Sequence, residues 1–424
     1  MTIFNRFIQY TTRNVAGKIA VSLYVLADTF FISQAVGANG LTALNLVLPI
    51  YSLLYGIGDM IGVGSSIRFS QEKENKKKFN YFTNAVIFGL IAGLFFTMVG
   101  LFFPVQILQL FGADSTIVMV GKAYTQIFMV LSPFFIWNQI FNSFVRNDDN
   151  PNLAMKATIY SSLFNIVFDY IFMYPLHMGM AGAALATGVS PILGLLICSK
   201  HVFSKRSNLH IQKMVPSIKK LVHSCQVGIS CLIAEVSSGV ITTLFNFLIL
   251  GLAGNIGVAA YGVIANIALI CVASLNGISL GVQPLVSECF GKGQKEDIQK
   301  LKKYGYITSI LFSLIIILIG YVFTNSIIAL FNSEKNMELY NMAYIGIRIY
   351  FLGFIGTGIN LVGGSILSSI SKAKEAFILS MLRGLVLICV FGILGAYFFG
   401  LNGIWASFVC CETICMLYTL KATS

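Results

Sequence analysis

One segment of the sequence, Asn165 to Phe172 (NIVFDYIF), carries an amide and a carboxylate four residues apart inside a long apolar run. In a helix, residues i and i+4 lie on one face, so Asn165 and Asp169 should point the same way. Tyr24 and Asp28 have the same spacing in an earlier apolar run. An ionisable group at membrane depth is destabilising by roughly 2.5–3.5 kcal/mol on insertion scales, so it indicates a functional site.

Other polar residues also lie in apolar runs. Thr187 and Asn142 add oxygen donors in the first half of the chain, and Glu235 is the main acid of the second half. Glu235 either takes part in binding a cation or forms a hydrogen bond that holds two helices together. Asp59, between glycines in YGIGDMIG, either faces a central cavity, where its charge would attract cations, or lies at a helix end. Arg383 is expected to extend its charged end to the cytoplasmic interface.

The composition excludes a water-soluble protein. Hydrophobic residues make up 57% of the 424 residues, charged residues only 10%, and the mean hydropathy is +0.82, whereas soluble domains carry about 25% charged residues. A bilayer-crossing helix needs about 20 apolar residues. The sequence has twelve such runs, near residues 15–36, 41–70, 80–104, 122–145, 153–175, 179–203, 221–250, 256–289, 304–329, 340–369, 375–399 and 402–420. The fold class predicted is an all-α membrane protein.

The net charge of +12 does not indicate nucleic-acid binding, because the basic residues cluster in alternate loops. The opposite loops hold little beyond Lys122 and Lys335. This pattern predicts that the basic loops and both termini are cytoplasmic, with anionic lipid binding as a second role. The clusters are Lys73, Lys76, Lys77 and Lys78; Lys200, Lys205, Arg206, Lys213, Lys219 and Lys220; Lys292, Lys295, Lys300, Lys302 and Lys303; and Lys372 and Lys374.

Features of enzymes and of cofactor sites are missing from the sequence. The nine cysteines include no CxxC pair and are expected to act as small hydrophobic residues. The four histidines fall at helix ends or in loops, and HExxH does not occur. The first apolar run is too long for a signal-peptide core and carries Asp28. We therefore predict neither an enzyme nor a bound cofactor, and no cleaved signal.

The two halves of the chain repeat one pattern at an offset of about 220 residues. GANGLTALNLVLPIYSLL from Gly37 resembles GNIGVAAYGVIANIALIC from Gly254, and GMAGAALAT from Gly179 resembles GLNGIWASF from Gly400. The pattern predicts two six-helix lobes, residues 1–207 and 208–424, joined by the loop from Ser204 to Ser217. An even number of spans gives the lobes one orientation, as in transporters built from parallel repeats.

Three stretches resemble the multidrug and toxic compound extrusion (MATE) transporters, and most of all a MepA-like bacterial branch. They are LADTFFISQAVGANGLTALNLVLPIYSLLYGIGDMIGVGSS, the Gln-Pro signature GVQPLVSECFGKGQ around Gln283, and FFGLNGIWASF. The resemblance implies twelve helices in two bundles forming a V, and export of drug-like, mostly cationic compounds in exchange for Na+ or H+. Gln283 becomes a candidate for coupling or substrate contact. We expect a monomer in the cell membrane.

The resemblance also implies a cation site. Four residues match its positions, Asp28, Asn165, Asp169 and Thr187, with Tyr24 and Asn142 nearby. Carboxylate, amide and hydroxyl oxygens are the ligands that hard cations prefer, and two buried carboxylates close together favour proton uptake. The same residues serve either ion. The alternative is that these groups only hydrogen-bond to one another and pin helices together.

The sequence departs from the family pattern in two places. No proline occurs between Asn14 and Val36, where relatives often have one, and RNDDNPNLA from Arg146 has lost the usual glycines. A lipid-linked oligosaccharide or lipid flippase of the same superfamily is the alternative function. Such flippases line their cavity with arginines that hold pyrophosphate, and Arg68, Arg348 and Arg383 are too few and too scattered for this role.

Overall fold

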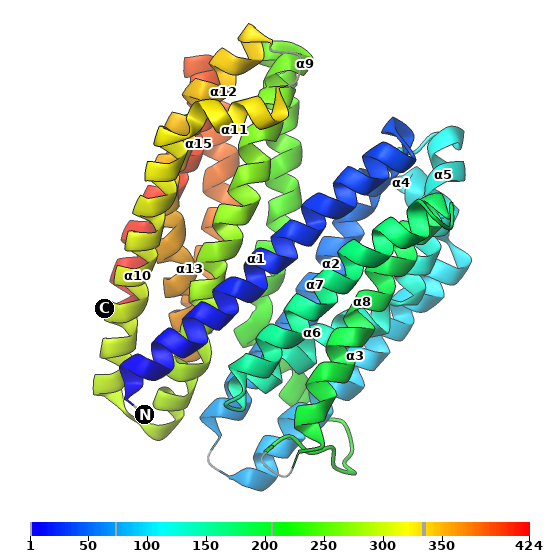
Figure 1. Ribbon diagram of the computed structural model, residues 1–424. Coiled ribbons are helices and arrows are strands. Elements are labelled where there is room, and N and C mark those ends of the chain that lie inside the picture. Colours follow the sequence, from blue (N-terminus) through cyan, green and yellow to red (C-terminus); the bar gives the residue numbers. More distant parts are fainter. Residues whose placement is uncertain (1, 73, 205–206, 333–335) are drawn as a thin grey trace. The chain divides into compact units, whose positions relative to one another are not determined.

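The computed structural model describes residues 2–72, 74–204, 207–332 and 336–424, which form helices joined by turns and loops (Figure 1). Five residues of the charge pattern, Lys73, Lys205, Arg206, Glu334 and Lys335, lie outside these ranges. The first half contains α1 (Ile3–Ala35), α2 (Ala38–Gln71), α3 (Asn75–Phe102), α4 (Pro104–Leu110), α5 (Ser115–Val130), α6 (Ser132–Asn147), α7 (Pro151–Met173) and α8 (Gly179–Val202).

The second half contains α9 (Ile218–Lys292), α10 (Lys295–Val322), α11 (Thr324–Phe331), α12 (Met337–Tyr350), η1 (Phe351–Gly353), α13 (Phe354–Ser369), α14 (Ala373–Met381), η2 (Leu382–Val386) and α15 (Leu387–Thr423). Two of these elements are broken. Gly254 in α9 and Gly400 in α15 have φ angles of 60° and 59°, a conformation that glycine adopts without a steric cost. Each break coincides with a glycine-rich turn of the sequence repeat.

The predicted spans are all helical. Within the described residues, eight helical stretches are long and apolar enough to cross a membrane, or nine when α5 and α6, bent by 48°, count as one. The broken helix α9 and the stretch from Ala373 to Thr423 each hold two predicted spans, and α7 supplies the span near 153–175. The chain is therefore an all-α membrane protein, as the sequence predicts.

The chain divides into two compact units. The N-terminal unit consists of Ala16–Val236 and Ser287–Gly293, and the C-terminal unit of Met1–Val15, Ser237–Val286 and Gln294–Ser424. The boundaries between these units differ from the boundary at 207/208 that the sequence repeat predicts. That boundary and the V-shaped arrangement of the two bundles stay predictions.

Close backbone packing explains why the start of α9 belongs to the N-terminal unit. A Cβ atom on Gly64 of α2 would collide with the carbonyl oxygen of Ser224, and one on Gly228 of α9 would collide with that of Met60. Small residues let membrane helices approach at this distance, where van der Waals packing is strongest. In the C-terminal unit, Gly281 of α9 packs against the backbone of Thr11 in the same way.

A buried carboxylate fastens the inter-lobe linker to the N-terminal unit. Asp148, after the end of α6, lies 2.8 Å from His201 Nε2, and it accepts hydrogen bonds from the Ser207 hydroxyl (3.2 Å) and the Asn208 backbone N–H (2.9 Å). Asp149 beside it has a φ of 56°, a conformation that Asp tolerates better than most residues. The turn RNDDNP thus forms without a glycine.

The contacts of Asp148 with His201, Ser207 and Asn208, called the clamp below, depend on the charge of Asp148, which persists over a wide pH range. Burial raises the pKa of Asp148, but hydrogen bonds from His201 and Asn208 outweigh burial and hold that pKa below its ordinary value. A carboxylate whose pKa is lower in the folded state contributes stability above its unfolded pKa and loses it as the pH falls through the folded pKa. The clamp should therefore weaken only below about pH 4.

Removing the clamp should release the linker. Asp148→Ala leaves the His201 ring and the Asn208 N–H without their acceptor. This loss should lower the free energy of opening the linker by about 1–3 kcal/mol. Local opening of the linker should become roughly 10- to 100-fold more frequent, and trypsin should cut after the exposed Lys213 correspondingly faster. Asp149→Asn, at an exposed neighbouring carboxylate, is the control. Equal cleavage of Asp148→Ala and wild type would show that Asp148 does not hold the linker.

Candidate functional site

Two buried carboxylates from different helices meet in the N-terminal unit. Asp28 of α1 is 7% exposed and Asp169 of α7 is 0% exposed, and the two interact electrostatically. Both acids belong to the i, i+4 pairs of the sequence, Tyr24 with Asp28 and Asn165 with Asp169. Oδ1 of Asp28 is buried and has no hydrogen-bond partner in the part of the chain that the structure describes.

The pattern of α7 determines where Asp169 points. Its buried residues, among them Ser161, Asn165 and Asp169, recur every three to four positions, which places them on one face. Leu163 and Val167 lie between them in sequence and are each 51% exposed. One face of α7 therefore carries the polar groups into the unit, and the other presents apolar side chains toward lipid.

Neutral oxygen donors surround the acid pair. Asn165 Nδ2 donates to Thr187 Oγ1 of α8 at 3.2 Å. Tyr124 of α5 is buried, interacts electrostatically with Asp28 and Asp169, and lies with its hydroxyl against Thr187. All four matched residues, Asp28, Asn165, Asp169 and Thr187, thus belong to one cluster, which Tyr124 completes.

A group of tyrosines borders the cluster on the side of α2. The Tyr24 hydroxyl lies 2.5 Å from the Tyr51 hydroxyl and 3.4 Å from the Tyr55 hydroxyl, and Tyr24 interacts electrostatically with Asp28. The rings of Tyr51 and Tyr55 stack with their centroids 4.4 Å apart. Tyr24 therefore lies beside the acid pair, where the sequence expects it, and links it to an aromatic wall.

Asn142 lies at a different level of the unit. Its Nδ2 donates to Thr158 Oγ1 of α7 at 3.4 Å, and Thr158 precedes Asn165 by about two helical turns. Among the described residues, the hydrogen bond of Asn142 is therefore with the beginning of α7, about 10 Å along the helix from Asn165.

Asp59 and Glu235 form a second charged cluster in the same unit. They interact with one another electrostatically, and Asp59 also interacts with Lys18 of α1 and Arg146 of α6. The start of α9 carries Glu235 against Gly56 of α2. This cluster contains two acids and two bases, whereas the groups identified around Asp28 and Asp169 among the described residues, Asn165, Thr187 and Tyr124, are neutral. The sequence gives no signal for this grouping because the four residues come from distant segments.

Polar residues of the C-terminal unit form a separate network. The prediction that Arg383 extends to the cytoplasmic interface is wrong, because its Nε donates to Glu412 Oε1 at 2.7 Å. Asn360 Nδ2 donates to Glu412 Oε2 at 2.7 Å, and Thr419 Oγ1 donates to Asn360 Oδ1 at 2.8 Å. Arg383 lies in η2, a π-helical turn. Turns of this kind often occur at functional sites.

Gln283 belongs to the C-terminal unit, where its side chain is buried. Its backbone carbonyl accepts a hydrogen bond from the Ser369 hydroxyl of α13 at 3.2 Å. The candidates for coupling or substrate contact thus divide between the units, with Asp59 and Glu235 in one and Gln283 in the other.

Comparisons with known proteins agree with this architecture. The MatE family model matches residues 15–171 and 231–394. The multidrug export protein MepA of Staphylococcus saprophyticus is 24% identical over 421 residues, covering 98% of this chain and 92% of the relative. MepA of Staphylococcus aureus is 26% identical over 431 residues, with the same coverage.

Solved structures show the same fold. An outward-facing multidrug resistance MATE family transporter of the MOP superfamily superposes with a TM-score of 0.92 at 21% identity, covering all of this chain and 95% of that one. A Pyrococcus furiosus transporter of that superfamily, whose reversed pocket polarity suggests a different function, gives 0.91 at 21% identity, with the same coverage. Since the MatE model covers more than half of the sequence, in both of its halves, the chain belongs to the MatE family.

Proposed function

We propose that this protein is a secondary active multidrug efflux transporter that exports organic, mostly cationic compounds in exchange for Na+ or H+. The family and the names of the MepA relatives support export of drug-like small molecules. In this proposal the chain acts as a monomer in the cell membrane, with both termini in the cytoplasm.

The observation that carries the proposal is the acid pair with its neutral surroundings. Asp28 and Asp169 are buried and interact with each other, and the groups around them, Asn165, Thr187 and Tyr124, carry no positive charge. Two bare carboxylates in one buried site are strongly unfavourable, so the pair must hold a proton or a cation when it is closed off from water. Such a pair is suited to take up a coupling ion on one side and release it on the other.

The donor set fits Na+ as well as a proton. The carboxylate oxygens of Asp28 and Asp169, the amide oxygen of Asn165 and the hydroxyl of Thr187 are hard ligands of the kind that hard cations prefer. The buried Oδ1 of Asp28 accepts no hydrogen bond from the described residues, which suits it to bind an ion or a proton. Binding drives a conformational change only to the extent that the ion has different affinities for the two states.

The second cluster is the better candidate for contact with a cationic drug than for the coupling ion. Asp59 and Glu235 already face Lys18 and Arg146, so their charges are balanced in this conformation. A drug that displaces one of these bases would gain a carboxylate partner. The flippase alternative gains no support, because Arg383 is paired with Glu412 and Arg146 interacts with Asp59, and neither arginine is available to hold a pyrophosphate.

Accumulation of a fluorescent cation in cells tests the proposal. Cells that express the protein should hold less ethidium than cells that carry an empty vector, with the protein's presence in the membrane checked by immunoblot. A protonophore or removal of Na+ should abolish the difference. If both kinds of cell accumulate ethidium at the same rate, the protein does not export such cations.

The predicted orientation can be tested by cysteine labelling in intact cells. Asn255→Cys, next to the break at Gly254, and Lys213→Cys, in the linker, both replace exposed residues. An impermeant maleimide should label Asn255→Cys and leave Lys213→Cys unlabelled, because the lysine-rich loops stay inside. Lys213→Cys should become labelled after the cells are permeabilised. The reverse pattern would mean that the orientation is inverted.

A further inference from the structure

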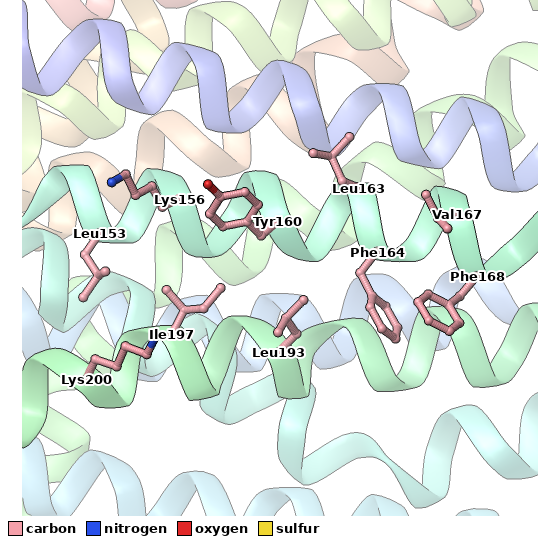
Figure 2. A pocket seen from close by; sticks show the side chains of 10 residues that line it. All are labelled: Leu153, Lys156, Tyr160, Leu163, Phe164, Val167, Phe168, Leu193, Ile197 and Lys200. Atoms are coloured by element: carbon pink, nitrogen blue, oxygen red, sulfur yellow. The ribbon is translucent and has the colours of Figure 1, made fainter.

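A groove lies between α7 and α8 on the side away from the acid pair. It has a volume of about 600 Å³, and residues of both helices line it (Figure 2). α7 contributes Lys156, Leu163, Phe164 and Phe168, and α8 contributes Leu193 and Lys200. Neither the proposed coupling site nor the second charged cluster uses any of these side chains.

One end of the groove is basic. Lys156 lies near the beginning of α7 and Lys200 in the last turn of α8, so both are at the same end of the helix pair. Both side chains are exposed, and neither forms an ion pair with an acid among the described residues. Tyr160 follows one turn after Lys156 and adds a hydroxyl to this end (Figure 2).

The rest of the groove is apolar. Phe164 and Phe168 stack with their centroids 4.0 Å apart and lie between the two helices (Figure 2). Leu163 and Val167 of α7, each 51% exposed, and Leu193 of α8 also line the groove. From Lys156 to Phe168 the helix rises about 18 Å at 1.5 Å per residue. This is close to the hydrocarbon depth of one leaflet, about 15 Å or half of a 30 Å core.

We propose that this groove binds one anionic glycerophospholipid of the cytoplasmic leaflet. The phosphate lies between Lys156 and Lys200, and one acyl chain runs along Phe164 and Phe168 toward the middle of the membrane. Two lysines that form no ion pair within the described residues are complementary to a phosphate, and the lysine-rich loops place this end of the helices on the cytoplasmic side. An apolar slot of one leaflet's depth below a basic mouth fits a lipid better than a soluble anion.

The position of the groove links the lipid to the proposed coupling site. α7 carries the groove on one face and Asn165 and Asp169 on the other. α8 carries Leu193 and Lys200 in the groove and Thr187 in the donor cluster. A lipid bound between the helices holds together the two elements that carry Asp169 and its neighbours Asn165 and Thr187.

Native mass spectrometry of the purified full chain in a neutral detergent tests the proposal. Phosphatidylglycerol should bind one molecule per chain more tightly than phosphatidylcholine. The double variant Lys156→Gln/Lys200→Gln should weaken phosphatidylglycerol binding roughly 30-fold, since each lysine near an anionic headgroup contributes about a factor of five. The matched control is Lys303→Gln/Lys374→Gln, which removes two exposed lysines elsewhere and should leave the affinity unchanged.

A third variant separates the groove from surface charge. Leu163→Trp fills the apolar slot and keeps both lysines, so it should also weaken phosphatidylglycerol binding, and inorganic phosphate should not displace the lipid. Equal affinity for the two lipids, or equal losses in the two double variants, would overturn the proposal. An unchanged affinity of Leu163→Trp would also overturn it, because attraction to the lysines alone would then account for binding.

Discussion

Asp28→Asn and Asp169→Asn should each abolish coupled efflux and leave the fold intact. An amide fills the space of the carboxylate, and removal of one buried charge relieves the repulsion between the two acids. The melting temperature should therefore not fall. Transport should nevertheless stop. A single carboxylate has no charged neighbour whose repulsion a proton or cation must offset, so the site no longer binds the coupling ion. Ethidium efflux from cells is the readout, with membrane expression measured in parallel.

The double variant Asp28→Asn/Asp169→Asn should transport no worse than either single variant. Residues that act as one unit give strongly non-additive losses. Asp297→Asn serves as the control, because that carboxylate lies in the first turn of α10, where it pairs with Lys300. Coupled efflux at the wild-type rate in Asp169→Asn would mean that the acid only pins helices together.

Glu412→Leu should cause the largest loss of stability among these variants. It leaves the Arg383 guanidinium without its carboxylate partner. The site is largely buried, because the Arg383 side chain is 21% exposed and the Glu412 side chain only 3%. Breaking a buried ion pair by removing one partner costs about 3–5 kcal/mol. It also takes away the acceptor that lies 2.7 Å from Asn360 Nδ2. Unfolding by titration with sodium dodecyl sulfate measures the loss.

The double variant Arg383→Met/Glu412→Leu should recover most of this stability. Replacement of both partners by apolar residues of similar volume is often neutral or stabilising. If this variant is stable and still exports ethidium, the ion pair is structural. A stable double variant that no longer transports would make the pair part of the mechanism. Wild-type stability in Glu412→Leu alone would contradict the strength assigned to the pair.

Local spacing was enough to predict some features from the sequence. The i, i+4 pairs predict that Asn165 and Asp169 share a face of α7 and that Tyr24 lies near Asp28, because both inferences need only helical periodicity. The glycine-rich turns mark the breaks at Gly254 and Gly400 because the breaks need a left-handed φ. Matching these segments to a family then brings Thr187 into the same cluster.

Other features depend on contacts between distant segments, which no local pattern encodes. Tyr124 is one of many aromatic residues in an apolar span, and only the packing of α5 brings it to Asp28 and Asp169. The pair of Arg383 and Glu412 joins residues 29 positions apart, whereas the sequence indicated snorkelling because long basic side chains usually reach water. The start of α9 joins the N-terminal unit through glycine contacts with α2 that the repeat pattern does not indicate.

The most direct test of the central claim is transport by the purified protein in proteoliposomes, with an imposed ion gradient as the only source of energy. An inward-directed gradient of Na+ or of protons should drive ethidium out of vesicles that contain the wild-type protein, and collapse of that gradient should stop it. Vesicles with Asp169→Asn should release ethidium at the rate of empty vesicles under either gradient. Ethidium release from wild-type vesicles that neither gradient accelerates, or equal acceleration in Asp169→Asn, would contradict the assignment of coupling to the acid pair.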